Sequence, residues 1–150
     1  MHADIRPARA SDIEALLSIE NSVFETDRLS RRSFQHHVKS RTALLLVLER
    51  EGGIAGYALL LFRDGSRVAR LYSIAVMLGR ERRGLGKWLL SAAEGAALSR
   101  GCILMRLEVR EENQRALELY QRTGYRRIGK MHGYYQDGTA ALRLEKDLRA

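Results

Sequence analysis

The chain has 150 residues, of which 45% are hydrophobic and 29% charged, and its formal net charge is +8. The composition excludes a disordered or fibrous protein, and the length favours one globular domain that spans residues 1–150. A single cysteine excludes an intrachain disulfide and a cysteine-based metal site.

The first 40 residues predict a strand and two helices. Residues 3–8 alternate weakly between apolar and polar side chains and favour a short strand. Ser11 and Glu14 have the spacing of a capping box, in which the two side chains bond free backbone N–H groups of the first turn, so a helix is expected to start there. Ser30 is expected to cap a second, shorter helix.

A hairpin, a third strand and a helix follow. Residues 43–49 and 54–62 are apolar runs rich in strand-forming residues, and Gly52-Gly53 between them predicts a turn. Residues 68–77 are interpreted as the next strand. The apolar period then changes from two to 3.6, which predicts a helix that ends at Arg100-Gly101. Its inward face is expected to carry Leu85, Trp88, Leu89, Ala92 and Ala96.

The last third predicts three more strands and one more helix. Residues 103–109 favour a strand, residues 113–122 a short helix, and residues 125–131 and 139–147 two final strands. The predicted order is strand, two helices, three strands, helix, strand, helix and two strands. This order indicates a mixed α/β fold and not a regularly alternating one.

The positive charge would attract a polyanion, such as nucleic acid or a phosphorylated small molecule, although an arginine-rich composition alone also accounts for it. No leader pattern opens the sequence, and no apolar run reaches the roughly 18 residues of a membrane helix. We therefore expect a cytoplasmic protein without a membrane partner. Cys102 is interpreted as a core residue. The adjacent His36 and His37 would point apart on a helix, so no metal site is predicted.

The most informative segment is a strand that runs into a basic, glycine-containing loop and then directly into a helix. The start of a helix offers unpaired backbone N–H groups and a partial positive charge, which suit phosphate oxygens. Gly84 and Gly86 let the backbone approach an anion closely. A nucleoside-triphosphate loop would need a glycine where Glu81 stands, and a dinucleotide fingerprint would need one where Leu89 stands. The segment therefore matches neither of these two motifs.

The stretch from Glu81 to Gly86 resembles the coenzyme A loop of the GCN5-related N-acetyltransferase (GNAT) superfamily. That pattern is Gln or Arg, two residues, Gly, one residue, and Gly or Ala, and here Glu81 stands at its first position. The resemblance covers nearly the whole chain, since Ser73-Ile74-Ala75-Val76, Asn113, Ala116, Leu119-Tyr120 and Gly124-Tyr125 also fall in the family's places. It implies a central mixed, mostly antiparallel sheet of about seven strands flanked by about four helices.

The resemblance also implies the residues that bind acetyl-coenzyme A (acetyl-CoA), the expected cosubstrate. Backbone groups of Ile74, Ala75 and Val76 would bond the pantetheine arm. Backbone amides and arginines of the loop would hold the pyrophosphate, and Asn113 and Tyr120 would lie near the coenzyme. The expected coenzyme contacts are Ile74, Ala75, Val76, Arg82, Arg83, Gly84, Leu85, Gly86, Lys87, Asn113 and Tyr120.

Direct transfer to an amine needs a base for the amine and an acid for the departing thiolate. By resemblance, Tyr120 is the expected acid, and an aromatic anchor on an amphipathic helix is its alternative. Glu108 is the expected base and resembles the glutamate of the ribosomal-protein-alanine N-acetyltransferase branch. Its alternative is a surface glutamate paired with Arg106 or Arg110.

The acceptor is expected to be a primary amine of a protein N-terminus, a lysine or a small molecule. Tyr134 and Tyr135 resemble tyrosines that border the acceptor site in the same branch, with ordinary strand aromatics as the alternative. Glu25 is a further candidate at that site. The protein is expected to be a monomer or homodimer, and two other functions stay open: a coenzyme A-binding regulatory domain without turnover, and a basic nucleic-acid-binding module.

Overall fold

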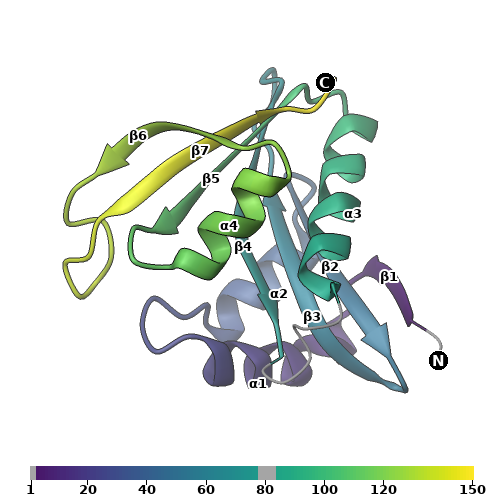
Figure 1. Cartoon of the computed structure of the whole chain (residues 1–150). Coiled ribbons are helices and arrows are strands. Elements are labelled where there is room, and N and C mark those ends of the chain that lie inside the picture. The colour runs from purple at the N-terminus through teal and green to yellow at the C-terminus, as the bar shows by residue number, and fades with distance from the viewer. Residues whose placement is uncertain (1–2, 78–83) are drawn as a thin grey trace.

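The computed structural model describes residues 3–77 and 84–150. The elements follow in the predicted order (Figure 1): β1 (Ala3–Pro7), the 3-10 turn η1 (Ala10–Asp12), α1 (Ile13–Val23), α2 (Arg31–Lys39), β2 (Ala43–Arg50), β3 (Gly53–Leu61), β4 (Val68–Val76), α3 (Leu85–Ser99), β5 (Leu104–Arg110), α4 (Gln114–Arg122), β6 (Arg126–Met131) and β7 (Ala141–Asp147). Within this part of the chain, no helix is long and apolar enough to cross a bilayer.

All seven strands belong to one sheet with the order β1-β2-β3-β4-β5-β7-β6. Every neighbouring pair is antiparallel except β4 and β5, which run parallel. The last strand, β7, inserts between β5 and β6, so β6 forms an edge of the sheet (Figure 1). The expectation of a mixed, mostly antiparallel sheet with four helices is confirmed.

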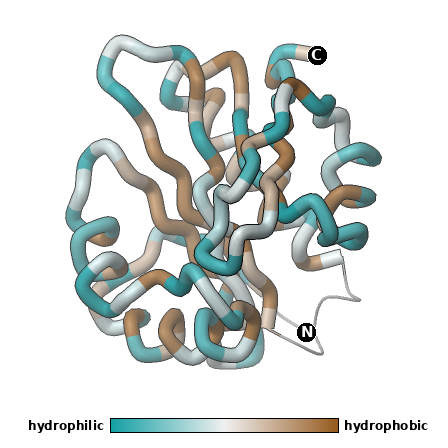
Figure 2. Tube along the Cα trace, turned by 90° about the vertical axis from the view of Figure 1, so that its left-hand side faces the viewer, coloured by the Kyte–Doolittle hydropathy of each residue, from teal (hydrophilic) through white to brown (hydrophobic). Residues whose placement is uncertain are grey.

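Two apolar cores lie on opposite faces of this sheet, because alternate residues of the central strands point to opposite sides. On one face, α3 and α4 pack over β3, β4, β5 and β7; on the other, α1 and α2 pack over β2 and β3 (Figure 1). In Figure 2, apolar residues follow the central strands and hydrophilic residues the outer turns. The second core contains no residue of β5, β6 or β7 among those described.

Strands β4 and β5 pair along only part of their length. The parallel register runs from Val68 opposite Leu104 to Leu71 opposite Leu107 and then stops, although β4 continues to Val76 (Figure 1). At the same point Tyr72 is an extra residue, because Leu71 pairs with Leu60 of β3 and Ser73 pairs with Leu59. A bulge bends a strand and increases its twist. Beyond Leu71, the side of β4 that faces β5 has no strand partner among the described residues.

The start of the first helix differs from the prediction. Asp12, and not Glu14, closes the first turn: its Oδ2 accepts the backbone N–H of Arg9 at 2.8 Å. Two guanidinium bonds from Arg6, at 2.8 and 3.0 Å, hold the Asp12 carboxylate in this position. Glu14 instead forms an ion pair with Arg31 of α2. Ser30 caps α2 as predicted, accepting the N–H of Ser33 at 3.1 Å.

The buried face of α3 is rotated from the predicted one. Leu85 and Leu89 are buried as expected, but Trp88 is 41% exposed, and the remaining buried positions are Leu90, Ala93 and Ala97. The small residues let α3 lie close to the sheet. Gly56 of β3 allows the same approach, because a Cβ there would lie 2.8 Å from the carbonyl oxygen of Ala75 and 3.0 Å from Leu89.

Candidate active site

The predicted coenzyme contacts lie along the unpaired edge of β4 and the start of α3. Ile74, Ala75 and Val76 all follow the last β4–β5 pair, so within residues 3–77 and 84–150 one side of this strand segment has no strand neighbour. Gly84 precedes α3 with φ of +71°, a left-handed conformation that favours glycine. Of the other loop residues, Leu85 is buried, Gly86 half-buried and Lys87 exposed, while Arg82 and Arg83 lie outside the described residues.

Helix α4 brings two predicted residues to the same end of the sheet. Asn113 caps the helix, its Oδ1 accepting the N–H of Ala116 at 3.1 Å. Tyr120 is buried, with its ring edge-on to that of Tyr125 at 5.4 Å. Burial and, to a smaller extent, the neighbouring Tyr135 raise the pKa of the Tyr120 hydroxyl. No hydrogen bond within the described part of the chain involves that hydroxyl.

Glu108 lies on the face of β5 opposite Leu107 and Val109, and its side chain is only 6% exposed. Its Oε1 accepts from Arg70 Nε and Nη2 of β4 at 3.0 and 2.7 Å, and its Oε2 accepts from Arg143 Nε of β7 at 2.9 Å. The predicted alternative of a surface glutamate paired with Arg106 or Arg110 is therefore wrong. Cross-strand neighbours, which the chain order does not reveal, supply its partners.

Arg70 also connects Glu108 to the predicted tyrosine pair. Its Nη2 donates to the Tyr134 hydroxyl at 2.9 Å, and the rings of Tyr134 and Tyr135 meet edge-on at 4.9 Å. Both tyrosines lie in the connection between β6 and β7 and not in a strand, so the alternative of ordinary strand aromatics is also wrong. Burial is the main cause that raises the pKa of Tyr135 to about 12.

Arg110, at the end of β5, joins the loop after α1 to the connection between β6 and β7. Its Nη2 donates to Thr26 Oγ1 at 2.6 Å, and its Nη1 donates to Asp137 at 2.9 and 3.1 Å. Its guanidinium also lies 4.2 Å from the centre of the Tyr135 ring. The predicted candidate Glu25 is exposed in the same loop. Arg110 thus holds the loop after α1 and the β6–β7 connection together across the end of β5.

A buried chain of polar groups supports this region from the α1 side. Glu20 of α1 accepts the backbone N–H of Leu29 at 2.7 Å and the Tyr57 hydroxyl at 2.5 Å, and Tyr57 lies 2.7 Å from Ser73 Oγ of β4. Burial raises the pKa of Glu20. Sequence reasoning missed Glu20, Tyr57, Arg70 and Arg143, because none belongs to a local motif and each acts through a partner far away in the chain.

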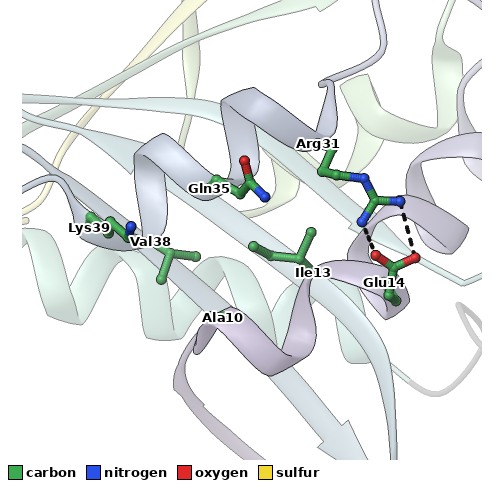
Figure 3. Close-up of a pocket in the computed structure, with 7 residues that line it drawn as sticks. All are labelled: Ala10, Ile13, Glu14, Arg31, Gln35, Val38 and Lys39. Carbon is green, nitrogen blue, oxygen red and sulfur yellow. Dashed lines mark hydrogen bonds and ion pairs between the residues drawn. The ribbon is translucent and has the colours of Figure 1, made fainter.

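A shallow pocket of about 410 Å³ lies elsewhere, between η1, α1 and α2 (Figure 3). The residues that line it are Ala10, Ile13, Glu14, Arg31, Gln35, Val38 and Lys39. Figure 3 shows the Glu14–Arg31 ion pair at one end of it. No predicted site residue lines this pocket, so it plays no part in the arrangement around Glu108 and Tyr120.

Comparisons with known proteins agree with this geometry. The profile of the Acetyltransferase (GNAT) family matches residues 11–125. The N-alpha-acetyltransferase of Sulfurisphaera tokodaii is 28% identical, over 96% of this chain and 92% of the relative. N-alpha-acetyltransferase RimI of Mycobacterium tuberculosis is 29% identical, over 93% and 85%. The solved ribosomal-protein-S18-alanine N-acetyltransferase of Escherichia coli superposes with a TM-score of 0.86 at 26% identity, over 98% and 94%.

The family profile covers most of the described elements, including the unpaired edge of β4, the start of α3 and Tyr120 of α4. Beyond its end, β7 contributes Arg143 to the surroundings of Glu108. The chain therefore belongs to the acetyltransferase (GNAT) family and is an acyl-CoA-dependent N-acetyltransferase.

Proposed function

We propose that this enzyme transfers an acetyl group from acetyl-CoA to the α-amino group of a protein N-terminus, and that residues 1–150 work as one acetyltransferase domain. The observation that carries the proposal is the position of Glu108. It lies beside the point where β4 and β5 separate, and Arg70 links it to Tyr134 of the β6–β7 connection. The names of the relatives from Sulfurisphaera tokodaii and Mycobacterium tuberculosis describe the same reaction.

The residues along β4 and α3 fit the donor. An unpaired strand edge at Ile74, Ala75 and Val76 can bond an extended amide chain as an added strand would. The first N–H groups of α3 have no intrahelical partner, and they suit a pyrophosphate. Bound acetyl-CoA would supply the thioester. Arg82 and Arg83 belong to this proposed loop by resemblance, and Asn113, another coenzyme contact by resemblance, caps the start of α4.

The acid and base are assigned from their surroundings. Tyr120, buried and with a raised pKa, stays protonated and can donate its proton to the departing sulfur. Glu108 takes the proton from the attacking amine, directly or through a water molecule. The amine nitrogen forms the new bond to the acetyl carbonyl carbon while the bond from that carbon to sulfur breaks. Tyr134, Tyr135 and Glu25 would border the acceptor.

An α-amine suits this base better than a lysine does. Both oxygens of Glu108 accept arginine hydrogen bonds, which hold the carboxylate in position. At pH 7 an α-amine with a pKa of about 8 costs about 1.4 kcal/mol to deprotonate, whereas lysine at about 10.4 costs about 4.6 kcal/mol. The α-amine has the smaller deprotonation cost and is therefore the proposed acceptor.

A thiol-release screen with acetyl-CoA tests the proposal. We expect free thiol with peptides that have an unblocked N-terminus, and none with the same peptides when the N-terminus is acetylated and a lysine supplies the only amine. Small polyamines serve as a third class of acceptor. Release with lysine peptides alone would contradict the choice of amine, and coenzyme A binding without release from any acceptor would indicate the regulatory alternative.

A further inference from the structure

Two arginines beside Glu108 have hydrogen-bond donors that the enzyme itself does not use. We call Arg70 and Arg143 the arginine pair. A guanidinium has five N–H donors. Arg70 uses Nε and Nη2 on Glu108 and Tyr134, and Arg143 uses only Nε on Glu108. Within the described chain, Nη1 of Arg70 and both terminal nitrogens of Arg143 have no partner. The two side chains are 40% and 38% exposed, so these donors can reach a ligand.

The arginine pair also carries an excess of positive charge. Two guanidiniums share the single carboxylate of Glu108, which leaves one positive charge uncompensated at this place. Arg110, the third arginine of the site, differs because Asp27 and Asp137 both pair with it. The uncompensated charge therefore lies beside Glu108 and Tyr134, and not at Arg110, where the loop after α1 meets the β6–β7 connection.

The excess continues along the same face of the sheet. Arg106 of β5 lies two residues from Glu108 on its strand and shares the carboxylate of Glu145 with Arg126 of β6. The core under α1 and α2 includes none of the described residues of β5, β6 or β7, so those helices do not cover this face. An acceptor chain that extends from the proposed amine site onto this face would meet arginines with unused donors.

Carboxylates are the groups that this arrangement suits. A planar guanidinium binds a carboxylate through two parallel hydrogen bonds and stays charged at every working pH. We propose that the arginine pair recognises an acidic side chain at the second or third position of the acceptor, so that the enzyme prefers N-termini followed by Asp or Glu. This inference rests on the proposed function, because it assumes that the acceptor is a peptide N-terminus.

The test compares three peptides that share their N-terminal alanine and differ only at positions two and three, which are Glu-Glu, Gln-Gln or Lys-Lys. We expect kcat/KM to be roughly tenfold higher for the acidic peptide than for the neutral one at low ionic strength, since hydrogen bonds to charged groups contribute that much. The difference should lie mainly in KM and should shrink as salt screens it.

Arg70→Gln and Arg143→Gln identify the residues responsible. Both arginines touch Glu108, so either change will lower the rate with every peptide; the informative quantity is the ratio of kcat/KM for the acidic and neutral peptides. We expect this ratio to fall towards one in each variant. Arg41→Gln is the matched control, because Arg41 is an exposed arginine paired with Asp64 and not with Glu108, and its loss removes the same charge.

The outcomes separate this inference from the proposed function. Equal rates with acidic and neutral peptides would overturn the acidic preference and leave N-terminal acetylation intact. An unchanged ratio in both variants would show that other residues cause the preference. Strong inhibition by a single-stranded oligonucleotide without any acidic preference would mean that the arginine pair binds phosphates of nucleic acid, which also overturns the inference. If none of the three peptides is acetylated, that result would contradict the proposed function itself.

Discussion

Tyr120 and Glu108 differ in how the fold determines their chemistry. Tyr120 comes from a helix and is enclosed by apolar and aromatic neighbours, which raise its pKa and keep the phenol protonated. Glu108 comes from a strand and is enclosed by charge, with an arginine on each carboxylate oxygen. One group is thus kept as a proton donor, while the other is held in position by two cations. The proposed roles of Tyr120 as acid and Glu108 as base rest on these environments.

The Tyr120 environment predicts the pH dependence of the reaction. A raised pKa means that the acid stays protonated as pH rises, so kcat/KM with a peptide N-terminus should increase through the amine pKa near about 8 and show no fall from tyrosine ionisation up to about pH 10. Tyr120→Phe should lower kcat by about a hundredfold or more while the KM for acetyl-CoA changes little. Steady-state kinetics across pH measures both.

Tyr125→Phe provides the control for that substitution. Tyr125 packs edge-on to Tyr120, and its hydroxyl donates a hydrogen bond to Glu94. Loss of the Tyr125 hydroxyl therefore changes the surroundings of the site without removing the proposed acid. We expect kcat within about threefold of the wild type. An equal loss of kcat in the two variants would mean that Tyr120 acts through packing and not through its proton.

Elements far apart in the chain meet at Glu20. This residue of α1 bonds the amide of Leu29 just before α2 and the hydroxyl of Tyr57 in β3, which in turn reaches Ser73 in the bulged part of β4. A charge buried in this way is costly unless it is paired or fully hydrogen-bonded. The arrangement therefore ties the loop between α1 and α2 to the strand proposed to bind the coenzyme.

Replacing Glu20 should affect stability in two different ways. Glu20→Gln keeps a carbonyl oxygen for Leu29, and its amide can donate to Tyr57, so the free energy of unfolding at pH 7 should change by less than about 1 kcal/mol. Glu20→Ala removes the acceptor of the Leu29 N–H, leaves the Tyr57 hydroxyl with Ser73 alone and opens a cavity, and should cost about 2–4 kcal/mol. Urea unfolding of the two variants measures the difference.

The difference in stability between the wild type and Glu20→Gln should depend on pH. Because burial raises the pKa of Glu20, the folded state holds its proton more tightly than the unfolded state does. The contribution is fully present below the unfolded pKa near about 4.5 and is lost as pH rises through the folded pKa. Wild type should thus lose stability relative to Glu20→Gln over this range. A constant difference from pH 4 to 8 would contradict the buried, titrating carboxylate.

At the scale of the whole molecule, different parts of the sheet are proposed to bind the donor and the acceptor. The unpaired edge of β4 and the start of α3 serve the proposed coenzyme, while the polar face of β5 and β7 and the two loops joined by Arg110 serve the proposed acceptor. The net charge of +8 acts over the whole surface and favours anionic ligands in general. Charge alone therefore does not distinguish a coenzyme from a nucleic acid.

Thermal unfolding distinguishes them. Coenzyme A at 100 times its dissociation constant should stabilise the protein by about 2.7 kcal/mol, which corresponds to a rise in Tm of roughly 5–10 °C for a chain of this size. NAD is the control, since it shares the pyrophosphate and adenosine but has no pantetheine arm for the edge of β4, and we expect a much smaller shift. A larger shift with an oligonucleotide than with coenzyme A would favour the nucleic-acid alternative.

Local patterns in the sequence were sufficient for the strands and helices, while the coenzyme contacts stay a prediction from the family resemblance. Alternation, the 3.6-residue period and the glycine after α3 predicted every strand and helix in order, and the glycine-containing loop indicated where α3 begins. One local pattern gave a wrong prediction at the start of the first helix. Ser11 and Glu14 matched the capping-box spacing, but Asp12 closes the turn because Arg6, from β1, holds its carboxylate.

The sequence by itself determined which segments become strands and helices and which loop resembles a coenzyme-binding one, because backbone periodicity and turn chemistry depend on near neighbours in the chain. Only the tertiary structure decided where β4 leaves β5 and which partners surround Glu108. Arg70 and Arg143 reach that carboxylate across two different strands, 38 and 35 residues away in sequence. Pairing over such separations is set by the register of the whole sheet, which no local pattern specifies.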